Sequence, residues 1–394
     1  MSDNLDNVTQ LDLDQPPEPR KGLIKKIVLF SAAIAAVCSV LALILFTDGL
    51  NMDSIRRWVK YMNVSENGTY GTYAFDSHGS NRYGEFDDGL AIASVSGLNT
   101  YDENGGERFI VQEQLALPQL LLNDQLAVAY DVGGHSLLAV DRKNGEVLRL
   151  KENRPILDAD LSSGGYLCTS SSASGYKSVL SVYNPNQDLI YRWLSSTTYI
   201  PLCAVSPDGK QMAAVALGQS DGVFESSIHI FATNSEEIQQ TISLGSELIY
   251  DLMFVDGSTI CAVGEDSVIY VSASGELLGS CTYGENYLKD FNSGGNGFLT
   301  LSLNMYRAGN RYSLLTVDNR GRKIAELYLG SEVLSLSANG RYIAVLTPEA
   351  LTIYTENLSV YHETVETGNA TAVLMREDGS VLLLGNGQGR LYIP

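Results

Sequence analysis

Short apolar stretches interrupted by Asp-Gly or Asn-Gly pairs recur along this chain of 394 residues. They are CAVSPDGKQMAAV at 203–215, FDDGLAIASV at 86–95, FVDGSTICAV at 254–263, LSANGRYIAVL at 336–346 and REDGSVLLLG at 376–385. Each joins the end of an apolar strand to a β-rich run through residues that tolerate positive φ. The pattern predicts a repeated β-hairpin, in which Pro207 and Gly209 shape a turn and carry no catalysis.

A second pattern follows these hairpins along the chain. It appears as LLAVDRKNGEVLRL at 137–150, SVYNPNQDLIYRW at 181–193, HIFATNSEEIQQTI at 229–242, IYVSASGELLGSC at 269–281 and LLTVDNRGRKIAEL at 314–327. Each copy is an alternating strand, a polar turn and a second alternating strand. The two patterns together make a unit of four strands that repeats about every 40 residues, which is typical of β-propeller blades.

Counting the units predicts the architecture of the domain. First strands are expected near Tyr83, Pro118, Pro155, Ile200, Leu248, Tyr287, Val333 and Thr371. The last unit, TAVLMREDGSVLLLGNGQGRLYIP, has only three strands, and GTYGTYAFDS at 68–77 can supply the fourth. We therefore predict an all-β protein, an eight-bladed propeller over 68–394 that is closed by pairing N-terminal and C-terminal strands. A count of seven stays open if one irregular unit is divided differently.

The segment IVLFSAAIAAVCSVLALILF at 27–46 carries no charge. As a helix it would cross a hydrocarbon layer of about 30 Å, which predicts one transmembrane helix over 23–47. A signal peptide is the alternative, but its apolar region is shorter and the following TDGLNMDSIRRW offers no cleavage site. Arg20, Lys21, Lys25 and Lys26 precede the segment, which favours a cytoplasmic N-terminus and an extracytoplasmic propeller.

The regions beside this helix give further expectations. Residues 1–22 are acidic and poor in aromatic residues, so we expect a disordered cytoplasmic tail. Residues 48–67 are predicted to form a juxtamembrane stalk or helix. Ser31, Ala35 and Ser39 form a stripe of small residues that would allow two helices to dimerise, although alanine-rich spans contain such stripes by chance.

Composition excludes several functions. The chain has 46 acidic and 26 basic residues and a net charge of −20, which disfavours binding to nucleic acid. The 4 histidines lie far apart, and no His/Cys spacing suggests zinc or another cofactor. Cys168, Cys203, Cys261 and Cys281 fall in predicted strands and are expected to be buried thiols, because a disulfide framework would be denser.

The motifs also carry a family resemblance. SPDGKQMAAV resembles the hairpin of WD40-like and TolB-like propellers, and AVDRKNGEVLRL resembles the blade motif of PQQ-like quinoproteins at Ala139, Asp141 and Gly145. Arg149 stands where that motif has its docking Trp, and the chain has 2 Trp and no adjacent cysteines, which argues against a quinone cofactor. The order of tail, single span, stalk and degenerate propeller resembles a membrane-anchored propeller family of unknown function from Gram-positive anaerobes.

Three short motifs suggest chemistry that their context does not support. GQSDG at 218–222 matches the serine-hydrolase pattern, but it falls between predicted strands instead of the strand-turn-helix that would expose Ser220. GNGQGR at 385–390 has the wrong spacing for a dinucleotide loop. YDENGG at 101–106 lacks the later bidentate Glu of a calcium loop.

Aspartates recur in three predicted first strands. ILDAD, IYDLM and LKDFN align Asp158, Asp251 and Asp290. First strands line the central channel of a propeller, so the three carboxylates would meet at one rim. There they would bind a cation or a basic ligand group, with Lys289 or a metal ion as counter-charge. The alternative is that each Asp accepts hydrogen bonds from amides of its own blade-to-blade loop.

These observations favour a single-pass membrane protein that presents the propeller as a binding or scaffolding module for a protein or envelope ligand. Two other classes remain: an enzyme, such as a hydrolase, lyase or oxidoreductase, and a sensory ectodomain that signals through the span. An enzyme predicts perturbed carboxylates clustered in the channel. A binding module predicts an exposed apolar or tyrosine-rich patch on one rim.

Overall fold

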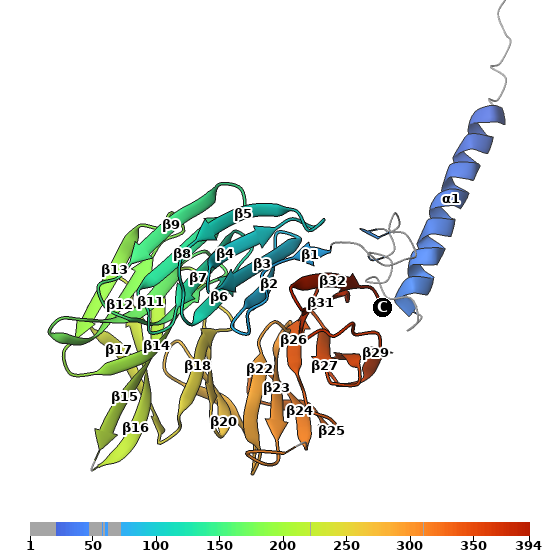
Figure 1. The fold of residues 1–394 in the computed structure, drawn as a ribbon. Coiled ribbons are helices and arrows are strands. Elements are labelled where there is room, and N and C mark those ends of the chain that lie inside the picture. The colour runs from blue at the N-terminus through green and yellow to red at the C-terminus, as the bar shows by residue number, and fades with distance from the viewer. Residues whose placement is uncertain (1–20, 47–56, 58–59, 62–71, 221, 310) are drawn as a thin grey trace, which may run out of the picture. The chain divides into compact units, whose positions relative to one another are not determined.

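The computed structural model describes residues 21–46, 57, 60–61, 72–220, 222–309 and 311–394. The chain forms two compact units, Met1–Val59 and Lys60–Pro394. In the first unit, Lys21–Phe46 form the helix α1 (Figure 1), which covers most of the span predicted at 23–47. In the part of the chain that is described, no helix is long and apolar enough to cross a bilayer. Most of the predicted tail and stalk lies outside the described residues.

The second unit is built from eight four-stranded antiparallel sheets, which we number as blades in chain order. Blade 1 contains β2 (Arg82–Phe86), β3 (Gly89–Ser94), β4 (Gly97–Tyr101) and β5 (Glu107–Gln112). Blade 2 contains β6 (Pro118–Leu122), β7 (Leu126–Asp131), β8 (Ser136–Asp141) and β9 (Gly145–Lys151). Blade 3 contains β10 (Ile156–Leu161), β11 (Leu167–Ala173), β12 (Tyr176–Tyr183) and β13 (Leu189–Ser195). Blade 4 contains β14 (Tyr199–Val205), β15 (Gln211–Ser220), β16 (Val223–Ala232) and β17 (Ile238–Gly245).

The remaining blades follow the same order of strands. Blade 5 contains β18 (Ile249–Phe254), β19 (Thr259–Gly264), β20 (Ser267–Ser272) and β21 (Leu277–Thr282). Blade 6 contains β22 (Tyr287–Asn292), β23 (Phe298–Asn304), β24 (Tyr312–Asp318) and β25 (Lys323–Leu329). Blade 7 contains β26 (Ser335–Asn339), β27 (Tyr342–Leu346), β28 (Leu351–Thr355) and β29 (Val360–Thr364). Blade 8 contains β30 (Ala372–Met375), β31 (Val381–Gly385) and β32 (Gln388–Tyr392), joined by β1 (Tyr73–Ala74).

The last blade closes the ring as the sequence predicts. Its strand order is β1-β32-β31-β30, and Tyr73 and Ala74 pair with Gly389 and Gln388. The N-terminal strand thus completes a sheet that the C-terminus leaves one strand short, and first strands of blades 8 and 1 lie in contact. The prediction of eight blades with terminal closure is confirmed, and a count of seven is excluded.

Local sequence explains why each hairpin forms where it does. In the turn after β14, Gly209 has a φ of 67° and its amide donates to the carbonyl of Ser206 at 2.9 Å. Asp87 and Asp88 both have positive φ, which matches the two-residue hairpin between β2 and β3. Second strands such as β3, β7 and β19 are buried on both faces and are therefore continuously apolar.

The hydrophobic core is divided among the blade boundaries. In the described part of the chain, eight clusters of buried residues each join two neighbouring blades. The cluster between blades 8 and 1 also includes Tyr61, which precedes the first blade. Because every sheet is covered on both faces by its neighbours, no blade can bury its apolar side chains alone.

The strand order defines two faces of the ring. We call the face where first strands begin, and where second strands turn into third strands, the entry face. The opposite face, which carries the hairpins after first and third strands, is the turn face. Neighbouring first strands run parallel. In β10 and β14 this is shown by two hydrogen bonds in the same order along both strands: Asp158 accepts from the Cys203 amide, and Asp160 accepts from the Val205 amide.

Candidate functional site

The three predicted aspartates occupy equivalent places in their blades. Asp158 lies in β10, Asp251 in β18 and Asp290 in β22. Each follows a register shift between its first strand and the second strand of the same blade. Such a bulge turns a side chain away from the regular pleat. Aligning the three first-strand segments of the sequence therefore identified positions that are equivalent in the three blades.

Their hydrogen bonds nevertheless differ. The Asp158 carboxylate accepts from the Cys203 amide of blade 4 at 2.8 Å and from the Tyr130 hydroxyl of blade 2 at 3.2 Å. Asp251 and Asp290 instead accept from the amides of the residues that follow them, at 2.8 and 2.9 Å. Asp251 and Asp290 therefore bond a backbone amide of their own strand, whereas Asp158 links blade 3 to blades 2 and 4.

The same inter-blade contact recurs elsewhere in β10 and in other first strands, through other side chains. Asp160 accepts from the Val205 amide at 2.9 Å, and Asn292 accepts from the Ala338 amide at 3.0 Å. Ser335 and Ser337 accept from the first strand of blade 8 at 3.1 and 2.9 Å. A first strand is the inner edge of its sheet and has amides that no sheet partner reaches. Acceptors from the preceding blade satisfy those amides.

The structure brings Asp158, Asp160 and Asp251 into electrostatic contact. Burial, together with a neighbouring carboxylate in each case, raises the pKa of each carboxyl to about 7. Desolvation also raises the pKa of Asp290, but the charge of this more exposed residue does not contribute to the other three. The comparison of first-strand segments within the sequence included Asp290 in the predicted site and did not include Asp160.

The structure shows Lys289 bonded to a backbone carbonyl instead of one of these carboxylates. Its ammonium group donates to the Arg307 carbonyl at 2.7 Å, and it forms no ion pair with Asp158, Asp251 or Asp290. In the described residues, no three His, Cys, Asp or Glu side chains are grouped to hold a metal ion. Binding of a cation or ligand by the predicted set therefore stays a prediction.

Aromatic side chains gather near Lys289 on the entry face. The Arg307 guanidinium lies 5.4 Å from the centre of the Tyr287 ring. Tyr250 of blade 5 and Tyr306 of blade 6 are 46% and 50% exposed. The pKa of Tyr250 is raised by desolvation and by Glu265, Asp266 and Glu247, whereas Arg307 lowers it. Tyr250, Tyr287, Lys289, Tyr306 and Arg307 form what we call the Tyr-Arg cluster.

Exposed large hydrophobic residues are distributed unequally between the two faces. In the described part of the second unit, those near the entry face are Leu117, Tyr176, Tyr199, Val223, Phe224, Leu248, Tyr250, Met305, Tyr306, Leu334 and Val365. The others lie on outer strands or follow β32. None lies in a turn-face hairpin, but the turn-face ends of outer strands carry Leu189, Ile190, Ile238, Leu277, Leu278, Ile324 and Val360, so the difference between the two faces is confined to the connections between strands. The binding-module hypothesis predicts an apolar or tyrosine-rich patch on one rim, but the fold was needed to place Tyr250 and Tyr306 on one face.

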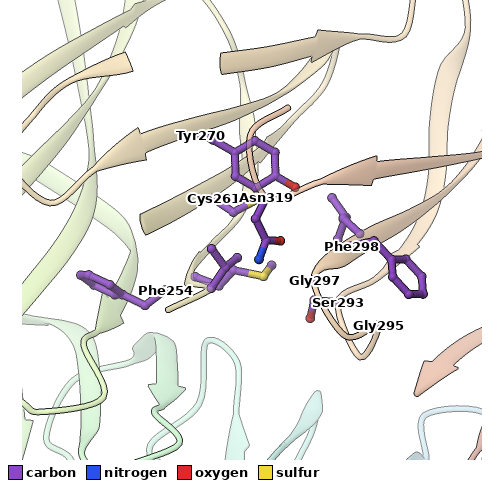
Figure 2. A pocket seen from close by; sticks show the side chains of 11 residues that line it. Phe254, Cys261, Tyr270, Ser293, Gly295, Gly297, Phe298 and Asn319 are labelled. Atoms are coloured by element: carbon purple, nitrogen blue, oxygen red, sulfur yellow. The ribbon is translucent and has the colours of Figure 1, made fainter. Parts of the chain in front are cut away.

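A cavity of about 210 Å³ opens between blades 5 and 6 on the turn side. Figure 2 shows Asn319 between the Tyr270 ring and the glycine-rich turn at 293–297. Tyr270 is fully buried, and its hydroxyl lies beside the weakly hydrogen-bonding Cys261 thiol, with no nitrogen or oxygen partner in the described residues. Burial also raises the pKa of the neighbouring Cys261 thiol to about 12, so this cysteine is no nucleophile.

Replacing Tyr270 with phenylalanine is expected to stabilise the protein by about 1 kcal/mol, because the variant no longer buries an unpaired hydroxyl. Urea denaturation of the Lys60–Pro394 unit measures the change. Tyr61→Phe is the matched control and should destabilise, since its hydroxyl bonds Asp378 at 2.9 Å. A loss of stability in Tyr270→Phe would show that the hydroxyl has a partner in solution.

The three short motifs are hairpins. Ser220 ends β15 and pairs with Val223 of β16, so the strand-turn-helix of a serine hydrolase is not present there. The glycine-rich segment at 385–390 connects β31 to β32. Asp102 accepts from the amides of Asn104 and Gly106 within the turn between β4 and β5. These contacts agree with the structural interpretation of all three.

Eight four-stranded blades, arranged in a closed ring, define the second unit as a β-propeller. The chain belongs to a family described as "Family of unknown function (DUF5711)", whose pattern matches residues 60–385. Comparison with curated proteins finds no match.

Solved propellers resemble the fold at low sequence identity. The WD40 repeats of RRP9 are 10% identical, with a TM-score of 0.45 over 70% of this chain and 96% of that chain. A chain of the mitotic checkpoint complex is 14% identical, with a TM-score of 0.47 over 70% and 86%. The Cps50 (Swd1) propeller of Myceliophteria thermophila is 12% identical, with a TM-score of 0.45 over 82% and 99%. These likenesses carry no argument about function.

Proposed function

We propose that this chain is a single-pass membrane protein whose extracytoplasmic propeller binds a protein partner through its entry face. The observation that carries the proposal concerns the connections between strands. The entry-face connections hold the exposed residues Leu117, Leu248, Met305, Tyr306, Leu334 and Val365, and the described turn-face hairpins hold no exposed large hydrophobic residue. A contiguous apolar patch on a soluble domain is a typical mark of an interaction site.

The chemistry of the Tyr-Arg cluster favours a protein over another envelope ligand. Tyrosine and arginine are enriched at protein interfaces, where both combine an apolar body with a polar end. Tyr250 and Tyr306 lie on different blades, so an occupant would bridge blades 5 and 6. Carboxylates near Tyr250 and the cations Lys289 and Arg307 would select its orientation through charge.

The first residues of the propeller unit make their contacts at the turn face. Lys60 and Tyr61 enter the propeller unit at the turn face, where the Lys60 ammonium lies 3.3 Å from Asp88 and Tyr61 bonds Asp378. Both aspartates belong to hairpins that follow first strands. These contacts therefore lie on the face opposite to the Tyr-Arg cluster.

Membrane anchoring rests on the first unit. The uncharged segment at 27–46 lies in α1, and Val28, Leu29 and Phe30 of this helix are exposed apolar residues. Exposure of such residues is costly in water and favourable in lipid. The extracytoplasmic location, PQQ-like ancestry, origin in Gram-positive anaerobes and dimerisation through Ser31, Ala35 and Ser39 stay predictions.

The test combines partner capture with matched variants of residues 60–394. Proteins retained by the wild-type unit from a cell-envelope extract are purified and their affinities measured. The double variant Tyr250→Ala/Tyr306→Ala should weaken binding about 30-fold or more, since interface tyrosines often contribute 2 kcal/mol or more. Ile324→Ala/Tyr328→Ala removes exposed side chains of the outer strand β25 and should leave affinity unchanged. Equal affinity of all three forms would contradict the proposal.

Catalysis in the channel is the second candidate, because Asp158, Asp160 and Asp251 have the raised pKa values of an acid–base set. The bonds of Asp158 and Asp160 to blade 4 favour a structural role. An activity lost in Asp251→Asn, with partner binding and folding unchanged, would favour an enzyme.

A further inference from the structure

Two buried cysteines meet across the boundary between blades 3 and 4. Cys168 lies in β11 and Cys203 in β14, and their sulfur atoms are 3.4 Å apart. Both residues are fully buried. Cys261 is equally buried but has Tyr270 as its cross-strand neighbour and no thiol within reach. The pairing is therefore specific to one boundary of the ring.

We infer that Cys168 and Cys203 are a site of disulfide formation that joins blades 3 and 4 covalently. The inference rests on the proposed extracytoplasmic location for its oxidant, since disulfides persist outside the reducing cytoplasm. One S–S bond forms and both S–H bonds break. The two electrons and two protons pass to the disulfide of a thiol–disulfide oxidoreductase or of a small molecule, which becomes two thiols.

The geometry needs only a small adjustment. A disulfide brings its sulfur atoms to about 2.05 Å, so the two thiols must approach by about 1.4 Å in total, shared between two side chains. The backbones are already held together at this boundary. Asp158 bonds the Cys203 amide itself, and Asp160, which pairs with Cys168 across the sheet, bonds Val205 at 2.9 Å.

Burial determines when the bond would form. It raises the pKa of both thiols, so the folded protein presents neither a thiolate nor an open path to an oxidant. Oxidation therefore belongs to folding, while blade 4 is docking on blade 3 and the two thiols are close together but still accessible. Once formed, the bond would be shielded from reductants for the same reason.

The first experiment examines the full chain from its own cells. Membranes are quenched in acid, unfolded and alkylated, and the peptides are mapped by mass spectrometry. We expect Cys168 and Cys203 in one linked pair lighter by two hydrogens, while Cys261 carries the alkyl label. Separate labelling of Cys168 and Cys203 would overturn the inference for the cell.

A second arm separates the geometry from the location. The full chain is synthesised in detergent with a glutathione redox buffer, so that the oxidant is supplied regardless of compartment. Linkage here should raise the melting temperature by about 5–10 °C over the Cys203→Ala variant under the same conditions. Linkage in this arm with free thiols in cells would refute the proposed location, whereas free thiols here would refute the geometry. The Tyr250/Tyr306 binding test does not depend on either result.

Discussion

Replacing Arg376 with methionine is expected to lower the free energy of unfolding of the Lys60–Pro394 unit by about 3 kcal/mol, because it leaves a largely desolvated carboxylate without its cation. Arg376 is only 3% exposed. Its guanidinium lies 3.3 Å from the Glu85 carboxylate and donates to the Asp88 carbonyl at 2.8 Å. Burial raises the pKa of Glu85 above its usual value, and the Arg376 cation opposes that rise.

The position of Arg376 in the ring makes this contact important. The residue follows β30 of blade 8, and Glu85 and Asp88 belong to blade 1. These contacts therefore cross the seam at which the two ends of the propeller meet. Tyr61 and Lys60 bind Asp378 on the same side of that seam, at 2.9 and 3.8 Å. Loss of Arg376 should loosen both the closure of the ring and the contacts that Lys60 and Tyr61 make with Asp378.

Urea denaturation followed by far-UV circular dichroism measures the effect, because it reports unfolding of all blades. Arg322→Met is the matched control, since its guanidinium is paired with Asp318 but its side chain is 73% exposed. Exposed pairs contribute about 0–1 kcal/mol, so this variant should unfold close to wild type. If Arg376→Met and Arg322→Met destabilised equally, the seam would not depend on the buried pair.

Thermal stability is expected to fall as the pH rises from 5 to 8. The pKa of Asp158, Asp160 and Asp251 is about 7 in the folded protein, compared with 3.8 ordinarily. Between these values the folded state retains protons that the unfolded chain has released, so increasing pH favours unfolding. The stability that protonation provides is complete at acidic pH and is lost as the pH passes through about 7.

Asp160→Asn should remove part of this dependence. The amide oxygen can still accept from the Val205 amide, but no charge is buried at high pH. We expect the variant to be about 1–2 kcal/mol more stable than wild type at pH 8 and close to it at pH 5, allowing for partial solvent access to the carboxyl. Melting curves of residues 60–394 at several pH values measure the difference.

Asp208→Asn is the control of opposite sign. Hydrogen bonds from the Lys210 amide and the Ser206 hydroxyl lower the pKa of Asp208, so its charge stabilises the folded state at neutral pH. This variant should gain no stability at pH 8. A melting temperature of Asp160→Asn that followed wild type at every pH would show that Asp160 titrates normally.

The blade repeat could be predicted because its determinants are local. Gly209 and the Asp87-Asp88 pair take backbone conformations that mark their hairpins, and alternation of apolar residues marks the strands between. The three-stranded last unit and the spare strand near Tyr73 then predict how the ring closes. The hairpins and strands are predicted from residues adjacent in sequence, and the closure follows from counting those strands. The structure confirms both.

Contacts between blades were decided by the tertiary structure. Asp158, Asp251 and Asp290 share a local pattern, yet only the first two approach each other, and Asp160 joins them. The meeting of Cys168 with Cys203 and of Arg376 with Glu85 likewise follows from which sheets become neighbours. By itself the sequence determined strands, turns and blade number, because these depend on backbone preferences and hydrophobic periodicity. Only the tertiary structure decided which polar groups meet, because those distances depend on how all eight sheets pack.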